Sequence, residues 1–538
     1  MGFDKRPLTL LFSSVIDYSN CVTGSMSQGG LSKGLSGLFA RRIPNLPLLK
    51  KTTSLMDVRS LLPQPVWNHF ADLNAIPRAS KHEAAVSRFM KAFGEGLGLE
   101  TIQDTVGNVI IRKAATPGME GRQTVALQGH IDMVQQKNAD VDFDFATEGI
   151  RMYVDGDWVK AKGTTLGADN GLGVAAIMAV LSSDDIPHPP LEALFTIDEE
   201  TGMTGAKELE PGILKARMML NLDTEEDDSL TIGCAGGVDV TGSGKYETEA
   251  PDSDVQGYRL FISGLKGGHS GGDIHLGRAN ANKLMNRLLS QAAEKFGLRV
   301  AAVDGGGLRN AIPRESGAIV AVPAGNASAF ETFLAEETGA LQKEYAVTDP
   351  ELKVEATGIP APERVWASDF QDRMLRVIYT LHNGIFRMSP AIAGLVQTSN
   401  NLARVRIGEG TFTVQCLTRS SVDSEKWDLA RGLEAALQLA GATVTFTGDY
   451  PGWTPLPGSQ VVQLASEVYE NLFGEPAHVD AVHAGLECGI IGGKYPAMEM
   501  ISFGPTITGA HSPDEQAQIS STQKFWKFLQ AVLAAVPE

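Results

Sequence analysis

The segment TVALQGHIDMV, at residues 124–134, is an apolar run that ends in polar residues, and two later segments repeat this design. They are LEALFTIDEE at 191–200 and MMLNLDTEE at 218–226, and a further strand-like segment, AMEMISFG, follows at 497–504. An apolar helical stretch, GLGVAAIMAVLSS, lies at 171–183. Strands that alternate with helices predict an α/β domain with a largely parallel sheet and helices on both faces. Polar residues at the carboxyl ends of such strands mark the sheet edge where sites usually form.

The stretch from residue 237 to residue 450 follows a different pattern. Its segments predict strand, helix, strand and helix, followed by helix, strand, helix and strand, which we interpret as an inserted α+β lid domain of two similar halves. The α/β pattern resumes at 451, so 56–236 and 451–538 are predicted to form one split catalytic domain. A chain of 538 residues is long enough for two or three domains.

Residues 1–55 have a composition unlike the rest of the chain. A short apolar run occupies 9–17, and 18–55 contain no Asp or Glu but several Lys and Arg among Ser, Gly and Leu. A targeting segment, a disordered tail and an upstream extension of the reading frame before Met56 all fit this composition. We favour a tail or an extension and leave the segment out of the predicted fold.

Net charge, hydropathy and cysteine spacing exclude several classes of protein. The net charge of -18 argues against nucleic-acid binding, which requires a basic face. No apolar run reaches the roughly 18–20 residues that a membrane-spanning helix requires. The cysteines are far apart and form no CxxC pair: Cys21, Cys234, Cys416 and Cys488. Neither a disulfide framework nor a cysteine zinc site is predicted, which fits a reduced, cytoplasmic setting.

Histidine and acidic side chains follow the predicted strands. His130 and Asp132 point the same way, because residues i and i+2 of a strand share a face, and such a carboxylate fixes the tautomer of a metal-binding imidazole. An HxD pair alone also occurs often by chance. Asp169 precedes the apolar helix, where it is either an ordinary helix N-cap or a charge that needs compensation.

The remaining acids and one more His complete the pattern. The run Asp198, Glu199 and Glu200 is self-repelling, and either a bound cation or a solvated loop would relieve that repulsion. Asp223 ends another apolar strand, and His511 follows the strand at 497–504. Carboxylates and imidazoles are suitable zinc ligands. Because each strand delivers its residues to the same end of the sheet, the joint pattern predicts a metal site more specifically than any of its parts.

These motifs, HID, LGADNG, DEETG, NLDTE and GAHSPDE in that order, resemble the signature of the co-catalytic zinc aminoacylase, carboxypeptidase and dipeptidase superfamily. The resemblance extends over 56–538. Three motifs of the predicted lid domain resemble the aminoacyl-histidine dipeptidase branch, also called cytosol non-specific dipeptidase: LKGGHSGGDIH (265–275), RNAIPR (309–314) and CLTRSS (416–421). A non-catalytic scaffold descended from such an enzyme would be expected to lose a ligand or the base, and none is missing here.

The resemblance implies two zinc ions, for which Mn²⁺ or Co²⁺ are suitable substitutes. The implied ligands are His130 and Asp223 for one ion, Glu200 and His511 for the other, and Asp169 as the bridge between them. Asp132 would support His130 from behind. Glu199 would be the general base that takes a proton from a zinc-bridging water as this water attacks the peptide carbonyl.

The same resemblance implies four further contacts to the substrate. His269 would complete the oxyanion site, Asn310 and Arg419 would hold the substrate, and Gly485 would offer a backbone contact. The competing interpretations are a surface histidine in a glycine-rich turn for His269 and a structural salt bridge for Arg419. A guanidinium at Arg419 suits a terminal carboxylate, which it binds in a bidentate fork.

The implied function is the hydrolysis of unblocked dipeptides, including Xaa-His types, by a homodimer in the cytoplasm. A cation for the terminal carboxylate and a metal centre for the peptide bond would favour substrates with one peptide unit between them. The alternative that keeps the zinc chemistry is an N-acyl amino acid or a tripeptide as substrate.

Overall fold

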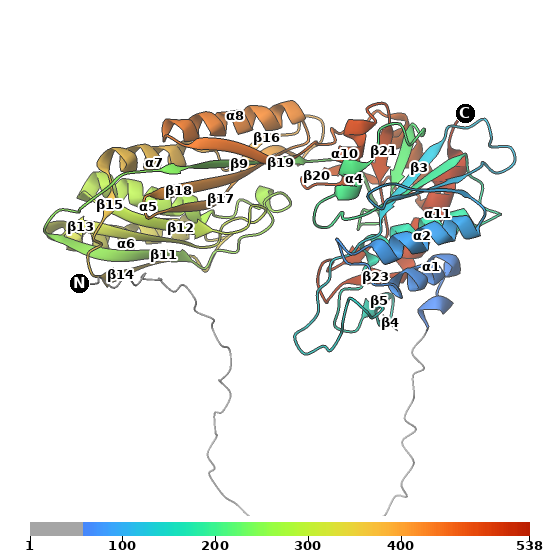
Figure 1. The fold of residues 1–538 in the computed structure, drawn as a ribbon, viewed down its shortest axis with the longest axis horizontal. Helices are drawn as coiled ribbons and strands as arrows, with labels where there is room; N and C mark the ends of the chain where they lie inside the picture. The colour runs from blue at the N-terminus through green and yellow to red at the C-terminus, as the bar shows by residue number, and fades with distance from the viewer. Residues whose placement is uncertain (1–56) are drawn as a thin grey trace, which may run out of the picture. The chain divides into compact units, whose positions relative to one another are not determined.

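A computed structural model describes residues 57–538, and one of its two large sheets has eight strands (Figure 1). Their order across the sheet is β1 (Glu100–Gln103), β2 (Val109–Lys113), β6 (Leu191–Thr196), β3 (Val125–His130), β7 (Met218–Asn221), β21 (Glu499–Ser502), β8 (Ser229–Cys234) and β20 (His478–Val482). The central strands β6, β3, β7 and β21 are mutually parallel, and so are β8 and β20. The pairs β1–β2, β2–β6 and β21–β8 are antiparallel.

Helices cover both faces of this sheet, because its central strands are apolar on both sides. Alternate residues of β3 enter different cores: Val125 and Leu127 pack into one, and Ala126 into the other. The helices of the first core are α1 (Gln64–Asn74), α2 (Ala84–Gly96), α3 (Ala168–Ser182), α9 (Gln460–Phe473) and α11 (Ile519–Ala535). The helices of the second are α4 (Thr204–Glu208) and α10 (Glu487–Lys494). The predicted α/β class with helices on both faces is therefore confirmed.

A small sheet beside the first core carries one loop of functional interest. Its four strands are, in order, β22 (Ile507–Thr508), β23 (Gln516–Gln518), β5 (Trp158–Ala161) and β4 (Met152–Asp155). The strands β22 and β23 are antiparallel neighbours, and the loop that connects them, 509–515, contains His511.

The segment between β8 and β20 forms the second large sheet, which has nine strands. Their order is β14 (Lys353–Ile359), β11 (Val255–Ser263), β13 (Ser316–Pro323), β12 (Arg299–Gly306), β17 (Val396–Gly408), β18 (Thr411–Ser420), β9 (Gly236–Lys245) and β19 (Thr443–Tyr450), with β16 (Gly384–Met388) paired to β17. The short strands β10 (Thr248–Glu249) and β15 (Val365–Trp366) pair separately. One hydrophobic core joins this sheet to its helices α5 (Ala281–Phe296), α6 (Ala327–Glu344), α7 (Ser368–Thr380) and α8 (Asp423–Leu439).

The nine-stranded sheet consists of two halves with the same topology. One half runs β11, α5, β12, β13, α6, β14, and the other runs β9, α7, β17, β18, α8, β19. In both halves the fourth strand lies beside the first, followed by the third and the second, and the halves meet where β12 pairs with β17. The two similar halves are confirmed, but they do not simply follow one another. The first half is inserted after β9, the first strand of the second half.

The limits of the predicted lid, 237 and 450, stay a prediction, although β9 begins at Gly236 and β19 ends at Tyr450. The expectations for 1–55, Cys21 included, lie outside the described residues. Between residues 57 and 538, no helix is both long and apolar enough to span a membrane.

Candidate active site

The central parallel strands bring three predicted ligand segments to one sheet edge. His130 is the last residue of β3 and lies opposite Thr196, the last residue of β6. Strand β7, on the other side of β3, ends at Asn221, two residues before Asp223. Since these strands are parallel, their carboxyl ends lie together, and the residues that follow them converge.

Asp169 reaches the same edge from the start of α3. It does not cap this helix: the N-cap is Gly167, and the Asp169 carboxylate contacts the imidazoles of His130 and His511, not the N–H groups of the first helical turn. The carboxylate of Glu515 takes that role, because it accepts the N–H groups of four successive residues, 166–169, at 2.7, 3.0, 2.7 and 3.3 Å. The N-cap interpretation of Asp169 is therefore wrong, and its carboxylate is free to point toward the strand ends.

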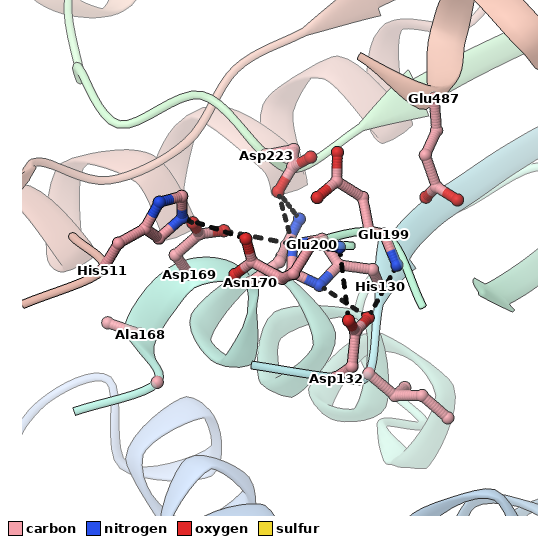
Figure 2. A network of polar contacts seen from close by, with 12 residues as sticks. His130, Asp132, Ala168, Asp169, Asn170, Glu199, Glu200, Asp223, Glu487 and His511 are labelled. Carbon is pink, nitrogen blue, oxygen red and sulfur yellow. Dashed lines mark hydrogen bonds and ion pairs between the residues drawn. The ribbon is translucent and has the colours of Figure 1, made fainter. Parts of the chain in front are cut away.

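The two oxygens of Asp169 contact two different groups of residues (Figure 2). Oδ1 lies 3.1 Å from Nε2 of His130, and this nitrogen is also 3.5 Å from Oδ1 of Asp223. Oδ2 lies 3.1 Å from Nε2 of His511, and this second nitrogen is 3.0 Å from Oε2 of Glu200. Each group therefore offers one imidazole, one carboxylate and one oxygen of Asp169.

Asp132 stands behind these groups and touches several of their members. Its Oδ1 lies 3.3 Å from Nδ1 of His130, and its two oxygens accept the backbone N–H groups of Glu199 and Glu200 at 3.1 and 3.3 Å. Ser80 donates its hydroxyl to Oδ2 at 2.8 Å. Such a partner orients the imidazole, so that Nε2 faces the other ligands, and it also fixes the loop that carries Glu199.

The acid-rich surroundings raise the pKa values of both histidines. Hydrogen bonds that His511 donates to the carboxylates of Asp169 and Glu200 raise its pKa to about 11. Burial lowers the pKa of His130, but Asp223, Asp132 and Asp169 outweigh it and raise that pKa well above its usual value. The half-buried Glu199 has a pKa well above its usual range because of burial and of the carboxylates of Asp223, Glu487 and Glu200.

These residues fit a pair of divalent cations by their donor chemistry. His130, Asp169 and Glu200 offer ligand atoms that all lie within 4.8 Å of one another. A buried oxygen of Glu200, Oε1, has no hydrogen-bond partner within the described part of the chain. Imidazole nitrogens and carboxylate oxygens that face one another at about 3 Å repel unless protons or cations lie between them, and mixed N/O sets of this kind suit zinc, manganese and cobalt.

A second group of predicted residues lies in the nine-stranded part of the chain, with Arg419 on β18 and with His269 and Asn310 in the loops after β11 and β12. The ring of His269 accepts the N–H groups of Gly271 and Gly272 at its Nδ1, at 3.3 and 2.9 Å, which places the ring proton on Nε2. Burial and the charge of Arg419 lower the pKa of His269, so the ring is neutral near pH 7. His269 is thus half-buried and oriented, not a free surface histidine.

Arg419 lies beside His269 and has no carboxylate partner. It is 5% exposed and contacts the hydroxyls of Tyr450 and Ser270 at 2.8 and 3.4 Å, with Nη2 at 3.4 Å from Nε2 of His269. Among the side chains of 57–538 no acid forms an ion pair with it, so the salt-bridge interpretation of Arg419 is wrong. The exposed Asn310 is adjacent, since its carbonyl accepts the N–H of Ser270 at 2.8 Å.

Gly485 belongs to the same surroundings, because a Cβ at this position would lie 3.2 Å from the ring and hydroxyl of Tyr450. No hydrogen bond or ion pair within the described chain links the group around Arg419 to the group around Asp169.

The greater part of the sequence matches a known family. The description of that family is "Peptidase family M20/M25/M40", and the match covers residues 126–535. The chain belongs to this peptidase family.

Two relatives resemble this M20 peptidase over most of its length. The cytosol non-specific dipeptidase of Escherichia coli K12 is 41% identical over 483 residues, which are 90% of this chain and 100% of the relative. The crystal structure of aminoacylhistidine dipeptidase from Vibrio alginolyticus is 43% identical, has a TM-score of 0.84, and matches over 90% of this chain and 99% of its own. Aminopeptidase PepT from Bacillus cereus shares the fold, with a TM-score of 0.52 at 15% identity over 88% of this chain and 99% of its own. The resemblance predicted from the motifs is confirmed.

Sequence reasoning about this M20 peptidase missed four residues that build the site. Glu515 ends the GAHSPDE motif that contains His511, and its place in this motif is the available signal. The buried Arg78 donates to the carbonyls of Asp132 and Gly167 at 2.8 and 2.5 Å, yet no motif surrounds it. Glu487 lies near the site in Figure 2, and its carboxylate accepts from Gln128 and Thr196, both at 2.6 Å. Tyr450, at the end of β19, accepts a hydrogen bond from Arg419.

One predicted feature of the acidic run differs from the structure. Asp198 has partners of its own: its carboxylate pairs with Lys81 and accepts the hydroxyls of Thr201 and Thr204. A lysine and two hydroxyls thus relieve the repulsion at Asp198, where the sequence indicated a bound cation or a solvated loop.

Proposed function

We propose that this M20 peptidase is a two-metal dipeptidase that hydrolyses unblocked dipeptides, including Xaa-His types. The observation that carries the proposal is the contact of the two Asp169 oxygens with two separate imidazoles, each at 3.1 Å. A carboxylate shared in this way is what a bridging ligand between two cations requires. The names of the relatives from E. coli and V. alginolyticus support dipeptides as the substrates.

The proposed ligand sets are His130 with Asp223 and His511 with Glu200, and Asp169 bridges the two. When bound, the metal pair would supply the Lewis acidity that lowers the pKa of a water and polarises the peptide carbonyl. Glu199 is the proposed general base: its N–H is fixed by Asp132, and its surroundings raise its pKa toward the range in which a carboxylate takes up and returns a proton. The Nε2–H of His269 is the proposed donor to the developing oxyanion.

Arg419 is the proposed binding group for the terminal carboxylate of the substrate. A buried guanidinium without an acidic partner is costly, and a substrate carboxylate would compensate it with charge-assisted hydrogen bonds. Asn310 and the backbone at Gly485 are proposed as further contacts. Zinc is the proposed metal, with manganese or cobalt as substitutes, and we further propose a homodimer located in the cytoplasm, the latter because the E. coli relative is named a cytosol enzyme.

A substrate panel tests the proposal directly. Metal-depleted protein, restored with zinc or manganese, is assayed on free dipeptides, the corresponding tripeptides, amidated dipeptides and N-acyl amino acids. Free dipeptides are expected to be cleaved fastest, and only after metal is restored. Tripeptides or N-acyl amino acids cleaved as fast as dipeptides would refute the substrate assignment. Mass analysis of the native protein gives the metal content and the number of subunits.

The variant Glu199→Ala separates an enzyme from a scaffold. It should lose hydrolysis while it keeps its metal, since Glu199 is the proposed base and not a ligand. Glu226→Ala, which removes an exposed carboxylate nearby, is the matched control and should retain wild-type activity. Unchanged hydrolysis in Glu199→Ala would remove this residue from the mechanism.

A further inference from the structure

Tyr450 makes the shortest polar contact of Arg419. It is the last residue of β19, and its hydroxyl accepts a hydrogen bond from Nη1 of Arg419 at 2.8 Å. The other two polar contacts of this guanidinium, with Ser270 and His269, are both 3.4 Å long. Tyr450 therefore contributes the best hydrogen bond that holds the charged group in place.

The ring of Tyr450 is itself held on several sides. A Cβ at Gly237, its partner on β9, would lie 2.9–3.0 Å from three atoms of the ring and hydroxyl, and a Cβ at Gly485 would lie 3.2 Å from two of them. The Tyr450 carbonyl accepts a hydrogen bond of 2.7 Å from the ammonium group of the buried Lys426. Two glycines thus leave room for the ring, and Lys426 anchors its backbone.

These contacts decide which side of the guanidinium is available. An arginine binds a carboxylate with two parallel N–H groups, either through Nη1 and Nη2 or through Nε and Nη2. Tyr450 accepts one N–H of Nη1, and the Ser270 hydroxyl accepts the N–H of Nε at 3.4 Å, so the N–H groups of Nη2, which lie toward His269, are left for a carboxylate. A carboxylate bound there would lie next to the proposed oxyanion donor.

We propose that Tyr450 is a positioning residue that orients Arg419 toward the C-terminal carboxylate of the substrate. The inference rests on the proposed dipeptidase function and names a determinant of its substrate class. It also explains why residue 485 is a glycine: a larger side chain would press against the ring of Tyr450.

The test uses steady-state kinetics of the metal-loaded, full-length chain. In Tyr450→Phe the KM for a free dipeptide should rise about tenfold to a hundredfold, because a buried charged donor loses its acceptor. The kcat should stay within about twofold of the wild type. For the amidated dipeptide, which has no carboxylate, Tyr450→Phe and wild type should be equal. Tyr469→Phe, which removes a hydroxyl that donates to the Asp227 carbonyl, is the control and should match the wild type on both substrates.

A double-mutant cycle separates positioning from a general structural effect. If Tyr450 acts through Arg419, adding Tyr450→Phe to Arg419→Ala should not raise KM further. Gly237→Ala, whose new methyl group would displace the ring, should raise KM for the free dipeptide as Tyr450→Phe does. Additive effects in the cycle, or an unchanged KM in Tyr450→Phe, would overturn the inference and leave the dipeptidase proposal intact. A wild-type enzyme that cleaves no dipeptide would instead overturn the proposed function.

Discussion

Replacement of Glu515 by Gln should loosen the bridging ligand without touching any proposed ligand. Glu515 is 3% exposed, and each of its two oxygens accepts two of the four N–H groups at residues 166–169. These N–H groups lead directly into Asp169. A glutamine has the same shape but replaces one of the acceptor oxygens by an NH₂ group, which faces two N–H donors and cannot bond to them.

The size of the effect follows from those lost bonds. Hydrogen bonds to a charged group are worth about 1.5–3 kcal/mol each, so two of them set an upper limit of roughly 3–6 kcal/mol. Bonds that share one carboxylate are not additive, so we expect the variant to lose about 3 kcal/mol of unfolding free energy. Replacing a residue that orients a metal ligand from behind typically lowers metal affinity by about 10–100-fold. We expect Glu515→Gln to weaken zinc binding by a factor of this size.

The assay is competition of the purified protein with a chelator of known zinc affinity, combined with denaturant unfolding of the metal-free form. Asp514→Asn is the matched control, because it makes the same chemical change at the neighbouring, exposed position. The control should keep wild-type affinity and stability. Zinc affinity of Glu515→Gln within about twofold of the control would refute the reasoning that the four N–H bonds position Asp169.

Three further predictions follow from the contacts and pKa shifts. Asp132→Asn should lower kcat about tenfold to a hundredfold with metal retained, because an amide cannot accept the backbone N–H groups of Glu199 and Glu200 and also orient the ring of His130. A kcat equal to that of the wild type would contradict this prediction. Metal binding at pH 7 should release protons, since His511 has a pKa of about 11 without metal and must deprotonate to bind it. Calorimetry in two buffers of different ionisation enthalpy gives the number of protons released, and a value of zero would contradict this prediction. Burial, with Arg419 and His269 nearby, lowers the pKa of His483 from 6.5 to about 3, so below pH 6.5 the unfolded chain binds a proton that the folded chain does not. Stability should therefore fall between pH 6.5 and pH 3 by at most about 1.4 kcal/mol per unit, and His483→Asn should flatten this slope in urea titrations relative to wild type.

The sequence predicted the α/β part of the fold better than the inserted part. Apolar strands that end in polar residues have a short, local signal, and the segments around His130, Glu200 and Asp223 carried it. In the nine-stranded sheet, the pairing of β9 with β18 and β19 joins residues about 170–200 positions apart, since Val238 lies opposite Thr418 and Thr443 opposite Ser243. Local periodicity contains no information about such pairings, so the insertion of one half within the other could not be predicted.

The site shows the same division between local and distant contacts. Residue types and spacing predicted the residues that meet around Asp169, because a metal-binding pattern requires His and carboxylates at strand ends. They did not predict Glu515 as the acceptor for residues 166–169, because that role depends on a loop nearly 350 positions away. The sequence around Asp198 shows only its acidic neighbours, because its partner in the structure, Lys81, lies 117 positions upstream. Supporting contacts of this kind depend on tertiary structure.

The two groups of residues are left with opposite, uncompensated charge, and this constrains what they bind. Around Asp169 the carboxylates raise the pKa values of both histidines, so cations that take the place of protons would be favoured there. Around Arg419 a buried guanidinium lies beside two neutral imidazoles, His269 and His483, and forms no ion pair with an acid among residues 57–538. An anion bound beside Arg419 would therefore be stabilised, and a single carboxylate is large enough to pair with the guanidinium. On the proposed function, a peptide with a free carboxylate would satisfy the second group and offer its carbonyl to metals bound at the first, whereas an amidated peptide would leave Arg419 unpaired. The electrostatics therefore argue for selection by the terminal carboxylate over selection by the side chains, which is the property expected of a dipeptidase with broad side-chain tolerance.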